Sequence, residues 1–291
     1  MILRDRSPSV SGTFYESTPS SLRERLKWCF LDKVGPGKLP EVPEKSSKGR
    51  EIISIVSPHA GYVYSGPVAA HGYYQLSLEP APDLVVIIGP NHTGMGAGVS
   101  VWPGGNWKTP LGNLSVDSDS ARALCEAGVA EGDDQAHLEE HSIEVQLPFL
   151  QFVYGNKPFK ILPVCMLLQD HETACDLGRA LSQILTGKSA LIVASTDFTH
   201  YEPYREAYEK DERISKAIIA MDSRRLFETV ARGGLSMCGP GPVMVAIEAA
   251  KGLGASECEK LCYATSGDTS GSKDQVVGYG SFLMRKKAQR Q

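Results

Sequence analysis

The chain lacks any long apolar run. Nowhere in its 291 residues does an uninterrupted apolar stretch approach the roughly 20 residues that a membrane-spanning helix needs. The segment from Met1 to Pro8 carries charges where a secretory leader would have its apolar region. An excess of positive charge is missing too, because the formal net charge of -4 argues against a general nucleic-acid or anionic-membrane surface. We therefore expect a cytoplasmic protein whose partners are small molecules or other proteins.

A pattern of paired cysteines is also missing. The seven cysteines are an odd number, and they are scattered through a sequence with 42% hydrophobic residues. A chain of this length and composition buries a large core without covalent cross-links. Reduced thiols are therefore expected instead of a disulfide framework. Cys258 and Cys262 have no second pair of similar spacing, which argues against a structural zinc site.

Three familiar ligand-binding or catalytic motifs are incomplete or absent. Gly187-Lys188-Ser189 resembles the end of a phosphate-binding loop, but Ser182 stands where the first glycine is required. Gly239-Pro-Gly241 has Met244 in place of the third glycine of a dinucleotide-binding turn. The Gly-x-Ser-x-Gly elbow of α/β-hydrolases does not occur. None of these three motifs therefore indicates the function.

What the chain does contain is short β-branched runs that alternate with helical patterns. Strands are predicted at 52–56, 84–88, 159–165, 190–195, 259–266 and 276–284, with a hairpin over 99–116. Helices are predicted at 67–76, 117–128, 141–152, 173–186, 205–220, 222–232 and 243–250. This alternation predicts a single α/β domain over residues 1–291, with a mostly parallel or mixed central sheet and helices on both faces.

Two of the predicted strands are each followed by a proline and then a histidine. These histidines are His59 and His92, and since parallel strands end at a common edge, both imidazoles are expected in one crevice. Cys238 precedes a predicted helix N-terminus, a position that lowers the pKa of a thiol. Two imidazoles and a thiolate would form a three-ligand metal site with open positions for water or substrate. The alternative is that Cys238 is a small buried residue of the core.

Four further side chains are candidates for the same crevice. Asp197 and His200 follow the predicted strand 190–195 and would serve as metal ligands or proton carriers, although a turn-capping aspartate beside a solvated histidine explains the spacing equally well. His141, at a predicted helix start, is a candidate acid or base or else a core histidine. Tyr62 is a candidate for a hydrogen bond to substrate, with packing as its commoner alternative. The histidines at 71, 137 and 171 are expected at the surface.

Seven short motifs follow one another along nearly the whole chain, and together they are more specific than any one alone. They are Ser11-Gly-Thr-Phe-Tyr15, Pro58-His-Ala-Gly-Tyr62, Gly89-Pro-Asn-His92, Thr109-Pro-Leu111, Glu140-His-Ser-Ile-Glu144, Ser195-Thr-Asp-Phe-Thr-His200 and Cys238-Gly239. In this combination the chain resembles the Memo family, the archaeal and bacterial relatives of the eukaryotic mediator of ErbB2-driven cell motility.

The resemblance implies a fold similar to the class III extradiol (LigB-like) dioxygenases, which hold non-haem iron with two histidines and a glutamate. In Memo-like proteins two histidines and a cysteine form the corresponding pocket. These carry over to His59, His92 and Cys238, with Asp197, His141 and His200 lining the pocket. A thiolate in place of the carboxylate departs from the dioxygenase pattern and admits copper or zinc as well as iron. Prokaryotic relatives are often grouped with an AMMECR1-like protein and a radical-SAM protein, which are expected partners by association.

Functions of different classes remain open. The leading hypothesis is a metal-binding, dioxygenase-like oxidoreductase that uses iron or copper, with zinc less favoured. In it, His200 or His141 acts as acid or base and Asp197 orients a ligand or water. The alternative is a non-catalytic module whose pocket recognises a peptide or protein partner. A zinc hydrolase, which would need a metal-bound water, is a third hypothesis.

Overall fold

The predicted strands assemble into one mixed sheet that organises the chain. The computed structural model describes residues 4–41 and 49–287. Within them the sheet order is β10-β11-β1-β8-β2-β7-β3-β6, and β9 pairs with β11. The strands are β1 (Ile52–Ser57), β2 (Leu84–Pro90), β3 (Val99–Val101), β6 (Glu131–Gly132), β7 (Lys160–Met166), β8 (Ala190–Ser195), β9 (His200–Glu202), β10 (Glu257–Thr265) and β11 (Val276–Arg285).

The centre of the sheet is parallel and its flanks are mixed. Strands β1, β8, β2 and β7 run parallel to one another, whereas β11 pairs antiparallel with β1 and β10, and β3 pairs antiparallel with β7. Ser57 lies opposite Ser195 in this register. The residues that follow β1 and β8 therefore leave the sheet side by side, which brings His59 and Asp197 to the same edge.

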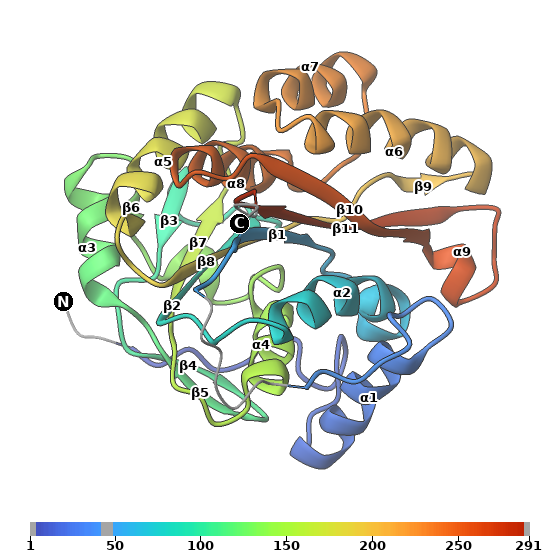
Figure 1. Cartoon of the computed structure of the whole chain (residues 1–291), viewed down its shortest axis with the longest axis horizontal. Coiled ribbons are helices and arrows are strands. Elements are labelled where there is room, and N and C mark those ends of the chain that lie inside the picture. Colours follow the sequence, from blue (N-terminus) through green and yellow to red (C-terminus); the bar gives the residue numbers. More distant parts are fainter. Residues whose placement is uncertain (1–3, 42–48, 288–291) are drawn as a thin grey trace.

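Helices cover both faces of the sheet (Figure 1). One core combines Val85 and Ile87 of β2 with residues of α1, α2 and α4, and the other combines Val86 and Ile88 with residues of α3 and α5 to α8. Successive side chains of a strand point to opposite faces, so a strand buried on both faces reads as a continuous apolar run. The helices are α1 (Pro19–Leu31), α2 (Tyr62–Ser77), α3 (Ser118–Glu126), α4 (Leu147–Tyr154), α5 (His171–Leu185), α6 (Tyr204–Ile219), α7 (Ser223–Gly233), α8 (Pro240–Gly252) and α9 (Ser266–Thr269).

These features confirm the predicted single α/β domain with a mixed sheet between helices, but two predicted helix starts are wrong. Helix α2 begins at Tyr62 and not at Pro67, because the Phe14 carbonyl accepts the Tyr62 N–H at 2.8 Å and caps the helix from a distant segment. The predicted helix 141–152 begins instead as a 3-10 turn at Glu144–Gln146 and continues as α4. Residues 141–143 stay outside it because the Glu140 carboxylate accepts the Ser142 N–H at 2.8 Å.

The predicted hairpin over 99–116 is also divided differently. Strand β3 joins the main sheet, while β4 (Asn106–Thr109) and β5 (Gly112–Ser115) pair with each other in a separate two-stranded sheet. Of the helices that the structure describes, none is both long and apolar enough to cross a membrane.

Candidate metal centre

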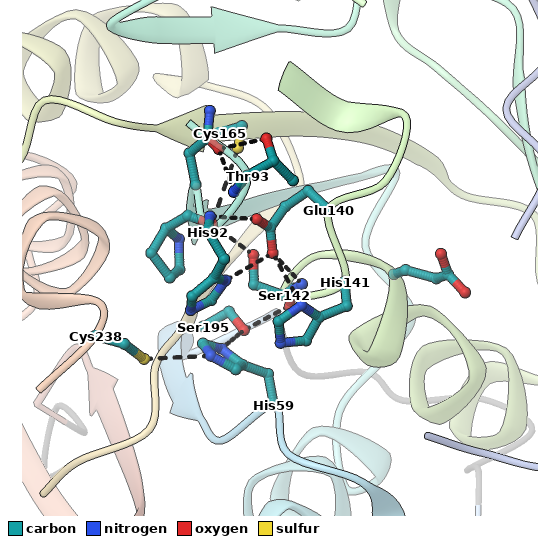
Figure 2. Close-up of polar contacts among 12 residues, drawn as sticks. His59, His92, Thr93, Glu140, His141, Ser142, Cys165, Ser195 and Cys238 are labelled. Atoms are coloured by element: carbon teal, nitrogen blue, oxygen red, sulfur yellow. Dashed lines mark hydrogen bonds and ion pairs between the residues drawn. The ribbon is translucent and has the colours of Figure 1, made fainter. Parts of the chain in front are cut away.

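Three potential metal ligands converge beyond the carboxyl ends of the central strands. His59 follows β1, His92 follows β2, and Cys238 lies two residues before α8. Their ligand atoms all lie within 4.8 Å of one another. The Cys238 Sγ is 3.2 Å from the His59 Nε2, and the two imidazole centroids are 5.2 Å apart. Figure 2 shows the three side chains turned toward a common point.

A close backbone approach delivers Cys238 to this point. A Cβ at Gly239 would lie 2.7 Å from the Ser195 carbonyl oxygen, so only glycine lets the two segments come this near. The Asp197 N–H points at the Cys238 Sγ over 3.2 Å, and the Thr196 hydroxyl accepts the Gly239 N–H at 3.0 Å. The end of β8 and the start of α8 thus fix the sulfur relative to the sheet.

Hydrogen bonds fix which nitrogen of His59 faces the cysteine. The single hydroxyl proton of Ser195 is donated to the Ser142 carbonyl at 2.6 Å, and the same oxygen accepts from Gln146 Nε2 at 2.8 Å. The His59 Nδ1, 2.9 Å from that oxygen, must therefore carry the imidazole proton and donate it. The unprotonated Nε2 is left facing Cys238, as a metal ligand must be.

His92 is oriented in the same sense by Glu140. The His92 Nδ1 lies 2.9 Å from the Glu140 Oε1, and the His92 backbone N–H donates to the Oε2 at 2.5 Å. The Glu140 side chain is fully buried. A carboxylate behind a histidine fixes the ring and increases the basicity of the other nitrogen, which is the arrangement that metal-binding histidines usually have. His92 therefore presents Nε2 to the crevice.

Burial controls the protonation of His59 and Cys238, whose Nε2 and Sγ atoms lie 3.2 Å apart. It lowers the pKa of His59 well below its usual value, and the neighbouring histidines lower it further. Burial and the Asp197 charge raise the pKa of Cys238 well above its usual value. The prediction that a helix N-terminus lowers this thiol pKa is therefore wrong, because the loss of hydration outweighs the dipole of α8. In the metal-free protein the Cys238 S–H donates to His59, and a metal would take the place of that proton.

The predicted acid and base residues lie at the same edge of the sheet. The His141 ring stacks on His92 at 4.6 Å and lies 5.3 Å from His59. The Asp197 Oδ1 accepts the His59 backbone N–H at 2.8 Å, and burial raises the pKa of Asp197 to about 6. His200 is half-buried, with its Nδ1 2.8 Å from the Ser236 carbonyl oxygen. Its charge is near enough to Asp197 to oppose part of that pKa increase.

Two expectations from the sequence are wrong. Tyr62 is buried, donates its hydroxyl proton to the Val145 carbonyl at 2.6 Å, and packs within the core, so its hydroxyl is not directed at a ligand. His137 is not at the surface but fully buried, with its ring centroid 5.9 Å from that of Trp102 and 5.8 Å from that of Trp107. The histidines at 71 and 171 are half-buried.

Sequence reasoning missed three residues that contact the candidate ligands or their supports. Glu140 carried a signal, because it adjoins His141 inside a recognised motif and carboxylates commonly support metal-binding histidines. Ser195 ends a strand and resembles many buried serines, and Gln146 carries no signal at all. Glu140, His92 and His141 also have possible metal-ligand atoms that lie within 4.8 Å of one another. However, the Glu140 oxygens already accept from His92 and Ser142, so Glu140 supports the site instead of forming a second one.

Comparison with known proteins identifies the family. Residues 6–283 match the family described as Memo-like protein. A MEMO1 family protein of Methanopyrus kandleri is 47% identical over 285 residues, which cover 97% of this chain and 99% of that protein. A MEMO1 family protein of Methanothermobacter thermautotrophicus is 48% identical over 277 residues, which cover 94% of this chain and 98% of that protein.

One solved structure, an uncharacterized protein from Escherichia coli K12, aligns with a TM-score of 0.48 at 11% identity. The alignment covers 80% of this chain and 99% of that one. This likeness is too weak to carry an argument. The family assignment rests instead on the match to the family model and on the two relatives, whose alignments cover almost the full length of each chain. The chain belongs to the Memo family.

Proposed function

We propose that this Memo-family protein binds iron or copper through His59, His92 and Cys238 and acts as an oxidoreductase on a small-molecule or peptide substrate. The observation that carries the proposal is the convergence of the three donors within 4.8 Å, with both histidine Nδ1 atoms already engaged. Their Nε2 atoms are left for one metal. Hydrogen bonds that fix the Nδ1-protonated tautomer of both histidines are expected in a metal site, whereas a hydrophobic core does not require them.

The donor set fits a transition metal. Two imidazoles and a thiolate are ligands that iron, copper and zinc all accept, whereas magnesium and calcium prefer oxygen. Three protein ligands leave coordination positions for water or substrate. The half-exposed His92 marks the side on which a substrate would enter, since 34% of its side chain is accessible. A bound iron or copper ion would supply one-electron redox chemistry and activation of oxygen.

The residues around the ligands have distinct roles in this proposal. Glu140 and Ser195 hold the His92 and His59 rings, so that both lone pairs stay directed at one point. His141 is accessible from the crevice, and burial lowers its pKa, so it is neutral near pH 7 and able to accept a proton from a substrate. Asp197 accepts the backbone N–H of His59 and so orients the loop that carries this ligand. His200 is the second candidate proton carrier.

Metal analysis of protein purified without a tag tests the ligand set. One iron or copper per chain is expected in the native protein, and Cys238→Ser should lose most of it. Cys175→Ser is the matched control, because Cys175 is also half-buried but lies on α5, outside the crevice. If Cys238→Ser retains the native metal content, the Cys238 sulfur is not a metal ligand.

Oxygen uptake separates the proposal from its alternatives. With the metal restored in its reduced form, iron(II) or copper(I), as the source of electrons, oxygen consumption or superoxide production should rise above background and should fall in the Cys238→Ser variant. Background rates together with a partner retained through the pocket would favour the binding module. Hydrolysis that proceeds equally without oxygen would favour a zinc hydrolase. An AMMECR1-like protein and a radical-SAM protein are the partners we propose to test.

The cytoplasm is the compartment that we propose. All seven cysteines lie within the described ranges, and each is a free thiol. This arrangement suits a reducing environment, in which thiols persist.

A further inference from the structure

A buried ion pair connects the N-terminal segment to the segment that carries Glu140 and His141. The Arg6 side chain is 1% exposed, and its Nη1 donates to the Glu144 Oε2 at 2.7 Å. The same carboxylate accepts the Ser9 N–H at 2.8 Å, the Val10 N–H at 3.1 Å and the Tyr15 hydroxyl at 2.6 Å. Glu144 therefore anchors residues 6–15 against the start of α4.

The remaining donors of Arg6 reach toward the candidate metal centre. The Arg6 Nε donates to the His137 carbonyl, and the Nη2 donates to the Glu140 carbonyl, each at 2.6 Å. One planar guanidinium thus joins two carbonyls and one carboxylate, a task that needs its fixed fork of donors. The side chain of Glu140 in turn holds the His92 ring. A continuous path of hydrogen bonds leads from Arg6 through Glu140 to a proposed ligand.

We infer that Arg6 and Glu144 are positioning residues for the metal centre, an inference that rests on the proposed function. They fix the backbone of residues 137–144, so that Glu140 meets His92 and His141 stacks beside it. The same anchor places Phe14, whose ring centroid lies 4.7 Å from that of His141. A role in stability alone is a poor explanation, because apolar residues of similar volume often stabilise a core as well as a buried ion pair does. Apolar residues could not hold two carbonyls in place.

Arg6→Lys tests the inference with the least damage to folding. Lysine keeps a positive charge beside Glu144, but its single ammonium cannot also span the carbonyls of His137 and Glu140. We expect cobalt(II) affinity, measured by competition with a chelator and scaled to the folded fraction, to fall about tenfold, the lower end of the effect of residues behind a metal ligand. The thiolate-to-cobalt absorption band should also shift, because the orientation of His92 changes.

Arg50→Lys is the matched control. The Arg50 side chain is 8% exposed, with its Nη1 2.6 Å from the Pro80 carbonyl oxygen and its Nη2 3.7 Å from a Glu79 oxygen. It lies before the first residue of β1, at the opposite end of the strand from His59. This substitution should lower stability while leaving cobalt affinity and the absorption band as in the native protein.

A readout in the metal-free protein separates this inference from the proposed function. In protein labelled with ¹⁵N-histidine, the His92 Nδ1–H that donates to Glu140 should give a downfield proton resonance, which Arg6→Lys should move or broaden. If the native protein binds neither iron, copper nor cobalt, the proposed function fails, and this resonance still decides the inference. Native affinity together with an unmoved His92 resonance in Arg6→Lys would overturn the inference. If Arg6→Lys does not fold, Glu144→Gln, which loosens the same anchor, is judged by the same two measurements.

Discussion

Replacing Ser195 by alanine removes the hydroxyl that holds His59. That oxygen lies 2.9 Å from the His59 Nδ1, 2.8 Å from the Gln146 Nε2 and 2.6 Å from the Ser142 carbonyl oxygen. Gln146 keeps a second acceptor, since its Nε2 also donates to the Pro58 carbonyl at 2.9 Å. Two buried groups, the His59 Nδ1–H and the Ser142 carbonyl, lose this partner. Each unsatisfied buried polar group costs about 1–3 kcal/mol, so Ser195→Ala should destabilise the metal-free protein by about 2–6 kcal/mol.

The substitution should also weaken metal binding. Without an acceptor for the Nδ1 proton, His59 can rotate or take the tautomer that protonates Nε2, and either change spoils it as a ligand. Loss of such a supporting contact weakens metal affinity by about 10–100-fold, which corresponds to about 1.4–2.8 kcal/mol. Urea unfolding of the apo protein would measure the first effect, and chelator competition would measure the second.

Ser54→Ala is the control for both measurements. Ser54 is fully buried in the neighbouring β1, but its hydroxyl has no hydrogen-bond partner among the described residues. Its loss should leave metal affinity unchanged. The free energy of unfolding should stay within about 0.5 kcal/mol of the native value or rise slightly, because an unpaired buried hydroxyl is removed. If Ser195→Ala lowers stability but binds metal as tightly as Ser54→Ala does, the argument from the His59 tautomer is wrong.

Three further predictions concern stability and affinity. Burial raises the pKa of Asp211 to about 6 although it accepts from Thr199. An aspartate with a raised native pKa makes the protein less stable as pH rises from about 4 to 6, by up to about 3 kcal/mol; urea unfolding across this range should show a loss that is smaller in Asp211→Asn by up to this amount, because Asp197, whose pKa is also raised to about 6, still contributes in the variant. Glu140→Gln should weaken metal affinity by about 10–100-fold, measured by chelator competition, because a neutral amide no longer favours the Nδ1-protonated form of His92; an unchanged dissociation constant would mean that the carboxylate is not needed. Free metal at 100 times its dissociation constant should add about 2.7 kcal/mol to the free energy of unfolding, which a chelator should remove in thermal unfolding; Cys238→Ser should abolish this gain, and a gain of equal size in that variant would contradict the ligand set.

The parts of the fold that follow from local pattern were predictable from the sequence. The apolar run before Pro58 predicts a strand buried on both faces, and the histidine after it is placed at the sheet edge by strand direction alone. The start of α2 could not be predicted in this way, because the Phe14 carbonyl that caps it lies 48 residues earlier in the chain. Pro67 misled the prediction, since proline is most common in the first turn of a helix.

The candidate site likewise contains residues that local pattern predicts and residues that depend on distant contacts. His59 and His92 follow from strand direction, whereas Cys238 depends on the family motif, and its raised pKa depends on burial that no local pattern reports. The supporting contacts are more remote still. Ser195 meets His59 across 136 residues of sequence, and Glu140 meets His92 across 48. Such pairs arise only when the packed sheet brings its loops together, so their partners cannot be read from spacing.

The most direct test of the metal centre is the position of the metal itself. Crystals of the protein from its own source, measured on both sides of the iron and copper absorption edges, would both locate and identify a bound ion. We expect one anomalous peak at about 2.0–2.3 Å from the His59 Nε2, the His92 Nε2 and the Cys238 Sγ. A peak on His141 and Glu140 with the sulfur uncoordinated, or a crevice that holds no metal, would contradict the account.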